Sequence, residues 1–506
     1  MDDSLPDHVD VVIVGTGLPE AILAAACSRS GLSVLHLDRN PFYGENWASF
    51  NLNTLDEWIG ENKKELSETT VSESIKEKIQ ADESYISFGD NRQIFDLEKQ
   101  WTEDSATEKV VKNKDGEETT STYRAIIEKE WRRFSIDITP KILLSRGTMV
   151  QTLCDSEVSK YAEFKCVNRL LCFCDGDKKI CRVPYNRSEI FETDQLSFVD
   201  KRRIMKFMQF CLEWSKNQDE MKDWKEFADK SFSEFLATVH NLEGSTQRFI
   251  TDAIAILEPN PTTLTGLQAV CRFIDSVGVF GPSPFLYPLY GCGELPQCFC
   301  RLCAVFGGLY ALHLQVDGII LKENKVVAVV AGGQRVNCDH IITSPRYAPK
   351  KFGTLSGELV DRAILVTDDT ILKEEKEQIS ILSLASISPP QCAARLFEAG
   401  YESCLAPRGY YLSQLTGARR DDKNYLKEVE EKLYDSEDSP RVLMRLRFAS
   451  AAGSFQYSEE SPTNFAVLPP PNVKLDYSDV IISSRELFTK FWPDRDFLPR
   501  GLPTVE

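Results

Sequence analysis

The chain has 506 residues, and its 77 acidic side chains outnumber its 59 basic ones, which gives a formal net charge of −18. A strongly acidic protein is repelled by phosphate backbones, so nucleic acid is not expected as the main partner. With 42% hydrophobic and 10% aromatic residues, the composition excludes a mostly disordered chain. The length allows about three domains or one large two-domain body.

The N-terminus lacks a basic start followed by an apolar stretch, so no secretory signal is expected, and no apolar run reaches the ~18 residues of a membrane span. The 15 cysteines are therefore expected to be reduced thiols of a cytosolic protein. Two groups of four, within 166–181 and 292–303, lack the paired spacing of a zinc site, so no metal is expected. The C-terminus has no cysteine at a lipidation position, so the chain itself is not expected to be prenylated.

The first elements predict the start of a dinucleotide-binding fold. A β-branched strand ends at Gly15, a helix rich in small residues follows, and a second strand ends at Asp38. The turn between strand and helix reads GTGLPE, with Glu20 in the place of the third glycine. A carboxylate there satisfies the helix dipole and repels a pyrophosphate, although Asp38 stands where a ribose-binding acid belongs. Two alternatives remain: a flavin or NAD site, or a fold that keeps the loop without a cofactor, and the residues favour the second.

Composition then divides the rest of the chain. Residues 61–124 are rich in charges, Ser and Thr, and predict a solvated, mobile insertion. Residues 150–164 fit a strand or a helix, whereas apolar residues at helical spacing over 198–256 predict an all-helical subdomain. Strands at 318–321, 325–331 and 340–343 have the spacing of a β-meander. A helix over 426–434 and a strand over 442–448 precede a proline-rich tail.

The stretch 281–312 contains the most informative polar pair. Glu294 and Arg301 are seven residues apart, so both project from one face of the predicted helix. They are a plain helix-surface pair or a polar recognition patch, and their apolar surroundings leave both open. Neither a nucleophile elbow nor a catalytic cysteine signature is present, so hydrolase chemistry has no support.

Three long segments carry a resemblance to a known family. They are DVVIVGTGLPEAILAAACSRSGLSVLHLDRNPFYG from residue 10, IDITPKILLSRGTMVQTLCDSEVSKYAEFK from residue 136 and PFLYPLYGCGELPQCFCRLCAVFGG from residue 284. Together they resemble the signature regions of the superfamily of Rab GDP-dissociation inhibitors and Rab escort proteins. The resemblance implies an α/β fold: a large domain similar to flavin monooxygenases, of the FAD/NAD(P)-binding, Rossmann type without cofactor, plus a smaller all-helical domain.

The implied domains are a large α/β domain over 1–197 and 283–468, with the charged insertion at about 61–124, and a helical domain over 198–282. Residues 469–506 are expected to form a loosely held tail. The insertion, the segment RAILVTDDTILKEEKEQISILSL from residue 362 and the tail favour the escort branch over a dissociation inhibitor that recycles prenylated Rabs. A flavin-dependent oxidoreductase is the alternative from another class.

The resemblance also implies partners and site residues. The partners are GDP-bound Rab GTPases, unprenylated and prenylated, the α/β dimer of Rab geranylgeranyltransferase, the geranylgeranyl lipid and, transiently, a membrane; the chain itself performs no catalysis. The expected Rab-binding platform contains Tyr43, Glu294 and Arg301, with Leu309 and Ala311 as neighbours. Phe273 is the expected transferase contact, although Val279 replaces an arginine common in that stretch. The candidates for a lipid groove are the aromatic residues Phe207, Phe210, Trp214, Phe232 and Phe235. The alternative is that each of them is an ordinary core residue.

Overall fold

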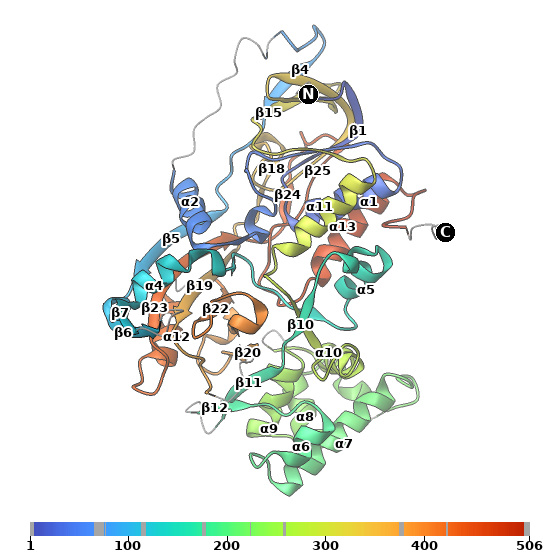
Figure 1. Cartoon of the computed structure of the whole chain (residues 1–506). Coiled ribbons are helices and arrows are strands. Elements are labelled where there is room, and N and C mark those ends of the chain that lie inside the picture. Colours follow the sequence, from blue (N-terminus) through green and yellow to red (C-terminus); the bar gives the residue numbers. More distant parts are fainter. Residues whose placement is uncertain are drawn as a thin grey trace, which may run out of the picture.

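The computed structural model describes residues 5–64, 75, 77–112, 118–174, 179–222, 224–256, 260–373, 379–420 and 424–499. Figure 1 shows a first large sheet near the N-terminus at the top, a second large sheet below it, and a group of helices, α6 to α10, at the bottom. This arrangement confirms the predicted α/β class with a helical part.

The first sheet has a parallel centre extended by a meander. β1 pairs in parallel with β2 and β17, and β14 pairs in parallel with β2. Val11 and Ile13 face helices α1, α11 and α13, whereas the alternate residues Val12 and Val14 face the other side, as the two-residue period of a strand requires. The strands are, in sheet order, β14 (Leu309–Ala311), β2 (Val34–Leu37), β1 (His8–Val14), β17 (Gln334–Thr343), β16 (Lys325–Ala331), β15 (Val316–Lys322) and β4 (Ser84–Ser87), with β25 (Phe465–Val467) beside β17. The helices are α1 (Leu18–Arg29), α11 (Glu294–Val305) and α13 (Ser478–Phe491).

The second sheet is mainly antiparallel, and only β11 and β20 pair in parallel among its described neighbours. Helix α12 (Tyr425–Tyr434) covers one face through its apolar side. The strands run in the order β12 (Lys179–Arg182), β11 (Arg169–Cys174), β20 (Ser380–Ser383), β21 (Arg395–Ala399), β22 (Tyr411–Ala418), β19 (Leu359–Thr367), β23 (Val442–Ala451) and β5 (Ile94–Trp101).

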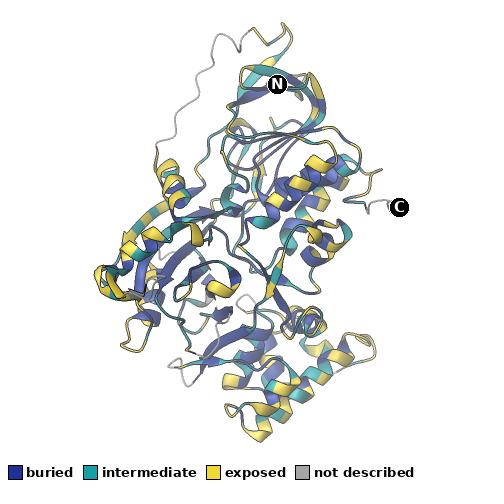
Figure 2. Ribbon diagram, viewed as in Figure 1, coloured by how far each residue is buried: buried dark blue, intermediate teal, exposed yellow. Residues whose placement is uncertain are grey.

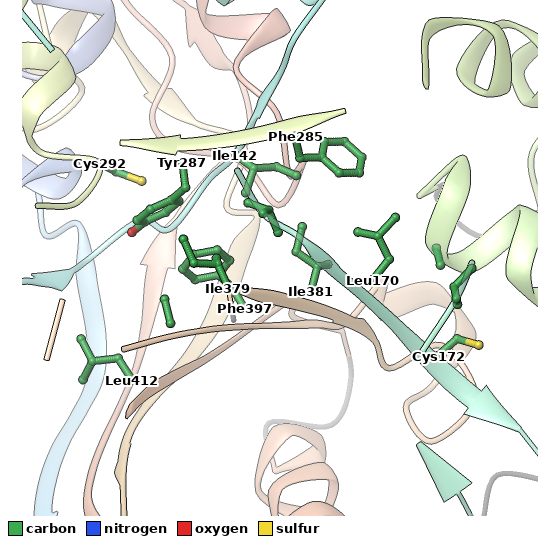
Figure 3. Close-up of a cluster of buried hydrophobic side chains, with 14 of the residues drawn as sticks. Ile142, Leu170, Cys172, Phe285, Tyr287, Cys292, Ile379, Ile381, Phe397 and Leu412 are labelled. Carbon is green, nitrogen blue, oxygen red and sulfur yellow. The ribbon is translucent and has the colours of Figure 1, made fainter. Parts of the chain in front are cut away.

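A small three-stranded sheet lies against the second large sheet. It consists of β10 (Phe164–Cys166), β13 (Phe285–Pro288) and β9 (Leu143–Leu144). Tyr287 stacks on Phe397 with ring centroids 4.4 Å apart, and Ile142 and Phe285 extend the same apolar layer (Figure 3). This shared core fixes the small sheet, and with it the chain that leads into α11.

The helical prediction for 198–256 is confirmed, and the helical group extends beyond it. Ser197 caps α7 and Thr262 caps α10 through their side-chain oxygens. Gly266 allows α10 to approach α8 closely, because a Cβ there would lie 2.3 Å from the Phe232 ring. The helices are α6 (Arg187–Glu192), α7 (Phe198–Trp214), α8 (Phe232–His240), α9 (Gly244–Arg248), a π-helical segment (Phe249–Ile254) and α10 (Thr263–Ser276).

The charged insertion is more structured than the sequence predicts. Residues 65–74, 76 and 113–117 lie outside the described residues, but β4 and β5 are edge strands of the two large sheets, and β6 (Glu108–Lys112) pairs with β7 (Glu118–Thr122). The prediction of a wholly solvated segment is therefore wrong for 84–101. An edge strand exposes one side to water, so its charged residues hide the strand pattern. Figure 2 shows exposed residues along β5 and the hairpin.

The structure also differs from the sequence predictions in smaller details. Residues 150–164 resolve into α5 (Thr148–Asp155), a short turn and β10. The predicted meander is confirmed, but its last strand begins at Gln334 rather than at His340. Near the insertion, the remaining elements are β3 (Ser49–Phe50), α2 (Leu52–Lys63), α4 (Tyr123–Lys129) and β8 (Ile136–Asp137), and β18 (Gly353–Leu355) pairs with β24 (Phe455–Tyr457).

The C-terminal tail is docked over its described length, contrary to the expectation of a loosely held segment. Helix α13 buries Val480, Ile481 and Phe488 in the same core as α1. The chain before α13 is held by Lys141, which is only 2% exposed. Its ammonium group donates to Asn472 Oδ1 at 2.9 Å, to the Asp476 carbonyl at 3.2 Å and to the Lys474 carbonyl. Burial lowers the pKa of Lys141 to about 7.

We predict that Lys141→Met releases this segment. The substitution keeps an apolar stem but leaves buried carbonyls without a donor, so the free energy of unfolding should fall by about 2 kcal/mol or more. Hydrogen exchange should also accelerate over the described tail. Lys490→Met, at an exposed position of α13, is the matched control and should behave as the wild type. Equal stability of the two variants would contradict the anchoring role of Lys141.

Candidate functional site

The glycine turn before α1 is filled by the protein's own side chain. Gly15 adopts a φ of +101°, which favours glycine, and Gly17 is the residue before the helix. The Glu20 carboxylate lies directly over Gly17, since a Cβ on that glycine would be 2.4 Å from Glu20 Oε2. Burial, with a smaller effect from Asp38, raises the pKa of the Glu20 carboxyl to about 8. The glycine that would let a pyrophosphate approach therefore faces a buried glutamate instead.

Asp38, which stands where a ribose-binding acid belongs, is likewise engaged in hydrogen bonds within the chain. Asp38 accepts hydrogen bonds from the Thr16 amide at 2.9 Å, the Thr16 hydroxyl at 2.6 Å, the Asn40 amide at 2.8 Å and the Tyr347 hydroxyl at 2.8 Å. Its carboxylate thus serves as a structural acceptor within the chain.

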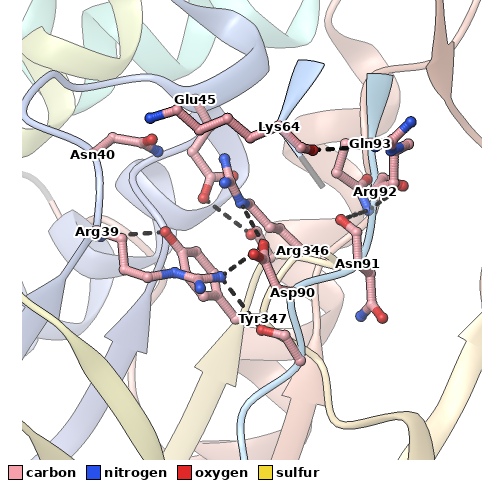
Figure 4. Close-up of polar contacts among 12 residues, drawn as sticks. Arg39, Asn40, Glu45, Lys64, Asp90, Asn91, Arg92, Gln93, Arg346 and Tyr347 are labelled. Carbon is pink, nitrogen blue, oxygen red and sulfur yellow. Dashed lines mark hydrogen bonds and ion pairs between the residues drawn. The ribbon is translucent and has the colours of Figure 1, made fainter. Parts of the chain in front are cut away.

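Charged residues close the rest of this region (Figure 4). Arg39 and Arg346 both contact Asp90, at 3.0 and 3.3 Å, and the Glu45 carboxylate accepts from the Ser344 hydroxyl at 3.1 Å. Beside Glu20, Glu45 and Arg346 a space of only about 20 Å³ remains, enough for about one water molecule. At this turn the residues present do not fit the pyrophosphate of a flavin or nicotinamide dinucleotide.

The N-terminus of α11 is positioned by Asp137, a fully buried residue. Its carboxylate accepts from the Ser49 and Tyr287 hydroxyls and, at 2.9 Å, from the Cys292 amide, and Ser49 accepts in turn from the Gly293 amide at 2.8 Å. Burial raises the pKa of Asp137, and these hydrogen bonds oppose that effect. The network joins β3, β8 and β13 and fixes where Glu294 begins the helix.

Glu294 and Arg301 lie on the accessible side of α11, as their spacing predicts. Glu294 is half-buried, and burial, followed by the nearby Asp137, raises its pKa. Arg301 is exposed, and its guanidinium lies 4.5 Å from the centre of the Tyr161 ring. Burial raises the pKa of the Cys298 thiol, which lies between them on the helix, to about 11; Glu294 adds to this effect and Arg301 opposes it.

Tyr43 lies beside β14, the edge strand that pairs with β2 in the first large sheet. It is half-buried, its ring centre is 5.9 Å from that of Tyr310 in β14, and burial raises its pKa. Leu309, 49% exposed, and the half-buried Ala311 belong to the same edge strand, so the five expected platform residues lie on α11, β14 and the loop after β2. Exposed Val305 and Phe306 continue this surface from the end of α11.

The lipid candidates of the helical group form a packed core. Phe207, Phe232, Phe235 and Trp214 are buried, and Phe210 is partly buried against them. Phe207, Phe210 and Phe235 surround His240 at ring-centre distances of 4.7 to 5.1 Å. The structure therefore places four of them in the core and the fifth, Phe210, against it, as the alternative of ordinary core residues predicts. Phe273 is likewise only 2% exposed and packs on Phe285, so its side chain does not reach the surface as a protein contact would.

Asp137, Tyr161 and Tyr310 are the supporting residues that sequence reasoning missed. An aspartate between isoleucines was the available signal for the first, because a charged residue inside an apolar run is either exposed or paired. Within the described ranges, no group of three or more His, Cys, Asp or Glu side chains could hold a metal ion, and no helix has the length and apolar character needed to cross a bilayer.

Comparisons with known proteins show which family the chain resembles. A family model described as "GDP dissociation inhibitor" matches residues 5–75 and 112–433. The Caenorhabditis elegans protein named "Rab proteins geranylgeranyltransferase component A 1" is 43% identical over 100% of this chain and 97% of its own length. A Schizosaccharomyces pombe protein named "Probable secretory pathway GDP dissociation inhibitor 1" is 29% identical over 81% of this chain and 80% of its own.

Two solved structures show the fold. A Rab GDI from Plasmodium falciparum matches with a TM-score of 0.68 and 22% identity, covering 97% of this chain and all of its own. An oxidoreductase from Methanosarcina mazei matches with a TM-score of 0.51 and 13% identity, covering 95% of this chain and 99% of its own. The predicted α/β class and its likeness to an oxidoreductase fold are thus confirmed.

We predict that Glu20→Gln changes how stability depends on pH. In the unfolded chain the carboxyl titrates near ~4.3, whereas in the folded chain it titrates at about 8. Between these values the folded state binds the extra proton, so wild-type stability falls as pH rises from 5 to 8. The amide does not titrate, so this fall should be smaller in the variant by about 1 kcal/mol or more.

Urea denaturation at pH 5 and pH 8 measures this difference. Glu57→Gln, at an exposed position of α2, is the control and should keep the wild-type fall. An identical fall in Glu20→Gln and wild type would show that Glu20 does not titrate in this range.

Proposed function

The chain belongs to the GDP dissociation inhibitor family, and from this premise we propose that it is a Rab escort protein. It binds newly made Rab GTPases in the GDP form, slows release of the nucleotide and presents the GTPase to the geranylgeranyltransferase α/β dimer. It then retains the lipidated product and delivers it to a membrane from the cytosol. The observation that carries the proposal is the full-length match to a transferase component A at 43% identity.

The escort branch is favoured by the region that the family model leaves out. Residues 76–111 fall between its two matched segments, and they contain β4 and β5, which are integral to both large sheets. The component A relative spans the whole chain, whereas the dissociation inhibitor from Schizosaccharomyces pombe covers 81% of it.

The platform supports binding of a protein partner. Tyrosine and arginine are the residue types most often responsible for binding energy at interfaces, and Tyr43 and Arg301 are the aromatic and guanidinium groups here. An arginine makes charge-assisted hydrogen bonds to an acidic partner residue. A surface that binds the GDP conformation better than the GTP conformation shifts the GTPase toward the GDP state, by no more than the difference in affinity.

A carrier role follows from the chemistry of the lipid. A geranylgeranyl chain has about twenty carbons, and at about 0.8 kcal/mol per buried carbon its transfer from water is worth up to about 16 kcal/mol. Such a chain requires an apolar site until it reaches a bilayer. The chain performs no bond chemistry in this proposal, and its dinucleotide-type turn is filled by its own residues Glu20, Asp38 and Glu45.

We predict that Tyr43→Ala or Arg301→Ala weakens binding of a GDP-loaded Rab by at least about 2 kcal/mol, because each removes a main anchor of the platform. Titration calorimetry measures the change. Arg202→Ala, which removes an exposed arginine of α7, is the control and should bind as the wild type does. Unchanged affinity in both platform variants would remove the assignment of these residues.

A pull-down with purified components tests the proposed function itself. The chain should capture unprenylated, GDP-loaded Rab and the transferase dimer in one complex. Capture of prenylated Rab alone, without the transferase, would instead identify a recycling dissociation inhibitor. Failure to capture Rab in either form would contradict both.

A further inference from the structure

A small cavity of about 20 Å³ lies between the second large sheet and the chain that leads into α13. Strands β19, β21 and β22 form one wall through Arg362, Arg395 and Gln414, and residues 472–475 of the tail form the other. The volume is enough for about one water-sized particle. The described lining includes no residue of α11, β14 or the helical group, so the cavity is separate from the platform. Below it is called the arginine cavity.

The strand register gathers the polar wall residues on one face of the sheet. Arg362 is paired with Thr416 across β19 and β22, and Thr416 is paired with Arg395 across β22 and β21. Gln414 is two residues from Thr416 in β22, so it projects from the same face. Since neighbouring strands are about 4.8 Å apart, the backbones of the two arginines are about 10 Å apart, with Thr416 between them.

Donors at this wall lack partners. Arg362 is only 2% exposed and donates to the Thr416 hydroxyl at 3.1 Å and the Ser450 hydroxyl at 3.4 Å, but its Nη2 has no hydrogen-bond partner among the described residues. The amide of Gln414, 1% exposed, has no described partner for either polar atom. The Thr416 hydroxyl accepts from Arg362, and its own hydrogen is a further donor. Buried donors without partners are rare, and they indicate a bound water or ion.

The charge around the cavity is positive. The described lining contains Arg362, Arg395 and Lys474 but no aspartate or glutamate. Lys474 pairs with Asp479 at 2.9 Å, whereas the hydrogen bonds of Arg362 go to hydroxyl groups rather than to a carboxylate. Burial lowers the pKa of Arg362 to about 10, so its guanidinium is still charged at neutral pH. Lys141 lies close by, because Arg362 is the next cause after burial of its lowered pKa.

We propose that the arginine cavity binds a single chloride ion. Arg362 Nη2, the Gln414 amide nitrogen and the Thr416 hydroxyl donate to it, and the ion neutralises the buried guanidinium. A water molecule would satisfy the donors but would leave the buried charge unpaired, which is costly. Phosphate, sulfate and carboxylates have several heavy atoms and need more than the space of about one water. An anion repels the Gln414 amide oxygen, so the nitrogen is the atom that faces the ion.

The ion connects the second sheet to the tail. Arg395 donates to the Val473 carbonyl at 3.3 Å, and Lys141 donates to Asn472 Oδ1 at 2.9 Å, so the chain that covers the ion is already held on both sides. Chloride thus provides a further anchor for this segment and stabilises the folded state by mass action. The assignment does not depend on the proposed function, because it needs no GTPase.

Thermal melting in potassium chloride and in potassium gluconate at equal concentrations tests the site, because gluconate is too large to enter. The wild type should melt at least about 2 °C higher in chloride, and the difference should saturate as the concentration rises. Arg362→Met removes the cationic ligand and should abolish the difference. Gln414→Leu keeps the charge and should reduce the difference to about half. Arg202→Met, at an exposed position of α7, is the control and should keep the full difference.

Bromide, a heavier halide, locates the ion directly. Crystals grown with sodium bromide should show an anomalous scattering peak between Arg362 and Gln414. The assignment would be overturned by an ordered water without anomalous signal at this position, by equal melting of the wild type in both salts, or by the full chloride effect in Arg362→Met. If Arg362→Met does not fold, Gln414→Leu decides, and the full wild-type difference in that variant contradicts the site.

Discussion

Two buried ionisable residues in one short segment form hydrogen bonds that connect distant parts of the chain. Asp137 and Lys141 are four residues apart, and each is surrounded by partners from distant parts of the chain. Burial raises the pKa of the carboxyl and lowers that of the ammonium group to about 7, so each side chain is costly unless its hydrogen bonds are complete. Removing one partner from such a group typically costs several kcal/mol. The start of α11 and the path of the tail are therefore tied to the same segment.

Buried polar groups with complete hydrogen bonds also explain why the dinucleotide-type turn has no room for a dinucleotide. Gly15 still provides the positive φ that the turn from β1 to α1 needs, so the loop remains useful to the fold. The space above it is taken by Glu20, and Asp38 uses its carboxylate within the chain. A fold can thus keep its architecture without keeping the use of one loop, and the platform that we propose lies on another surface, at α11 and β14.

Local sequence patterns predict the elements whose conformation depends on residues close in the sequence. The first strand and helix, the helices from 198 and the meander all follow from hydrophobic periodicity, and the shared face of Glu294 and Arg301 follows from helix geometry. The sequence pattern does not show which residues are buried by segments far away in the chain. In the sequence, edge strand β5 resembles a charged linker. The docked tail depends on Lys141, more than 300 residues earlier. The spacing of the helical aromatic residues favours an ordinary core but does not exclude a groove. Tyr43 was found through family resemblance alone.

The proposed platform and the docked tail depend on the same short segment. Asp137 supports the start of the helix that presents Glu294 and Arg301, and Lys141, four residues later, holds the chain that leads into α13. A change that loosens this segment should therefore disturb α11 and α13 together. A partner that binds the folded surface of α11 would stabilise the folded state by mass action, and it would stabilise the docked tail with it.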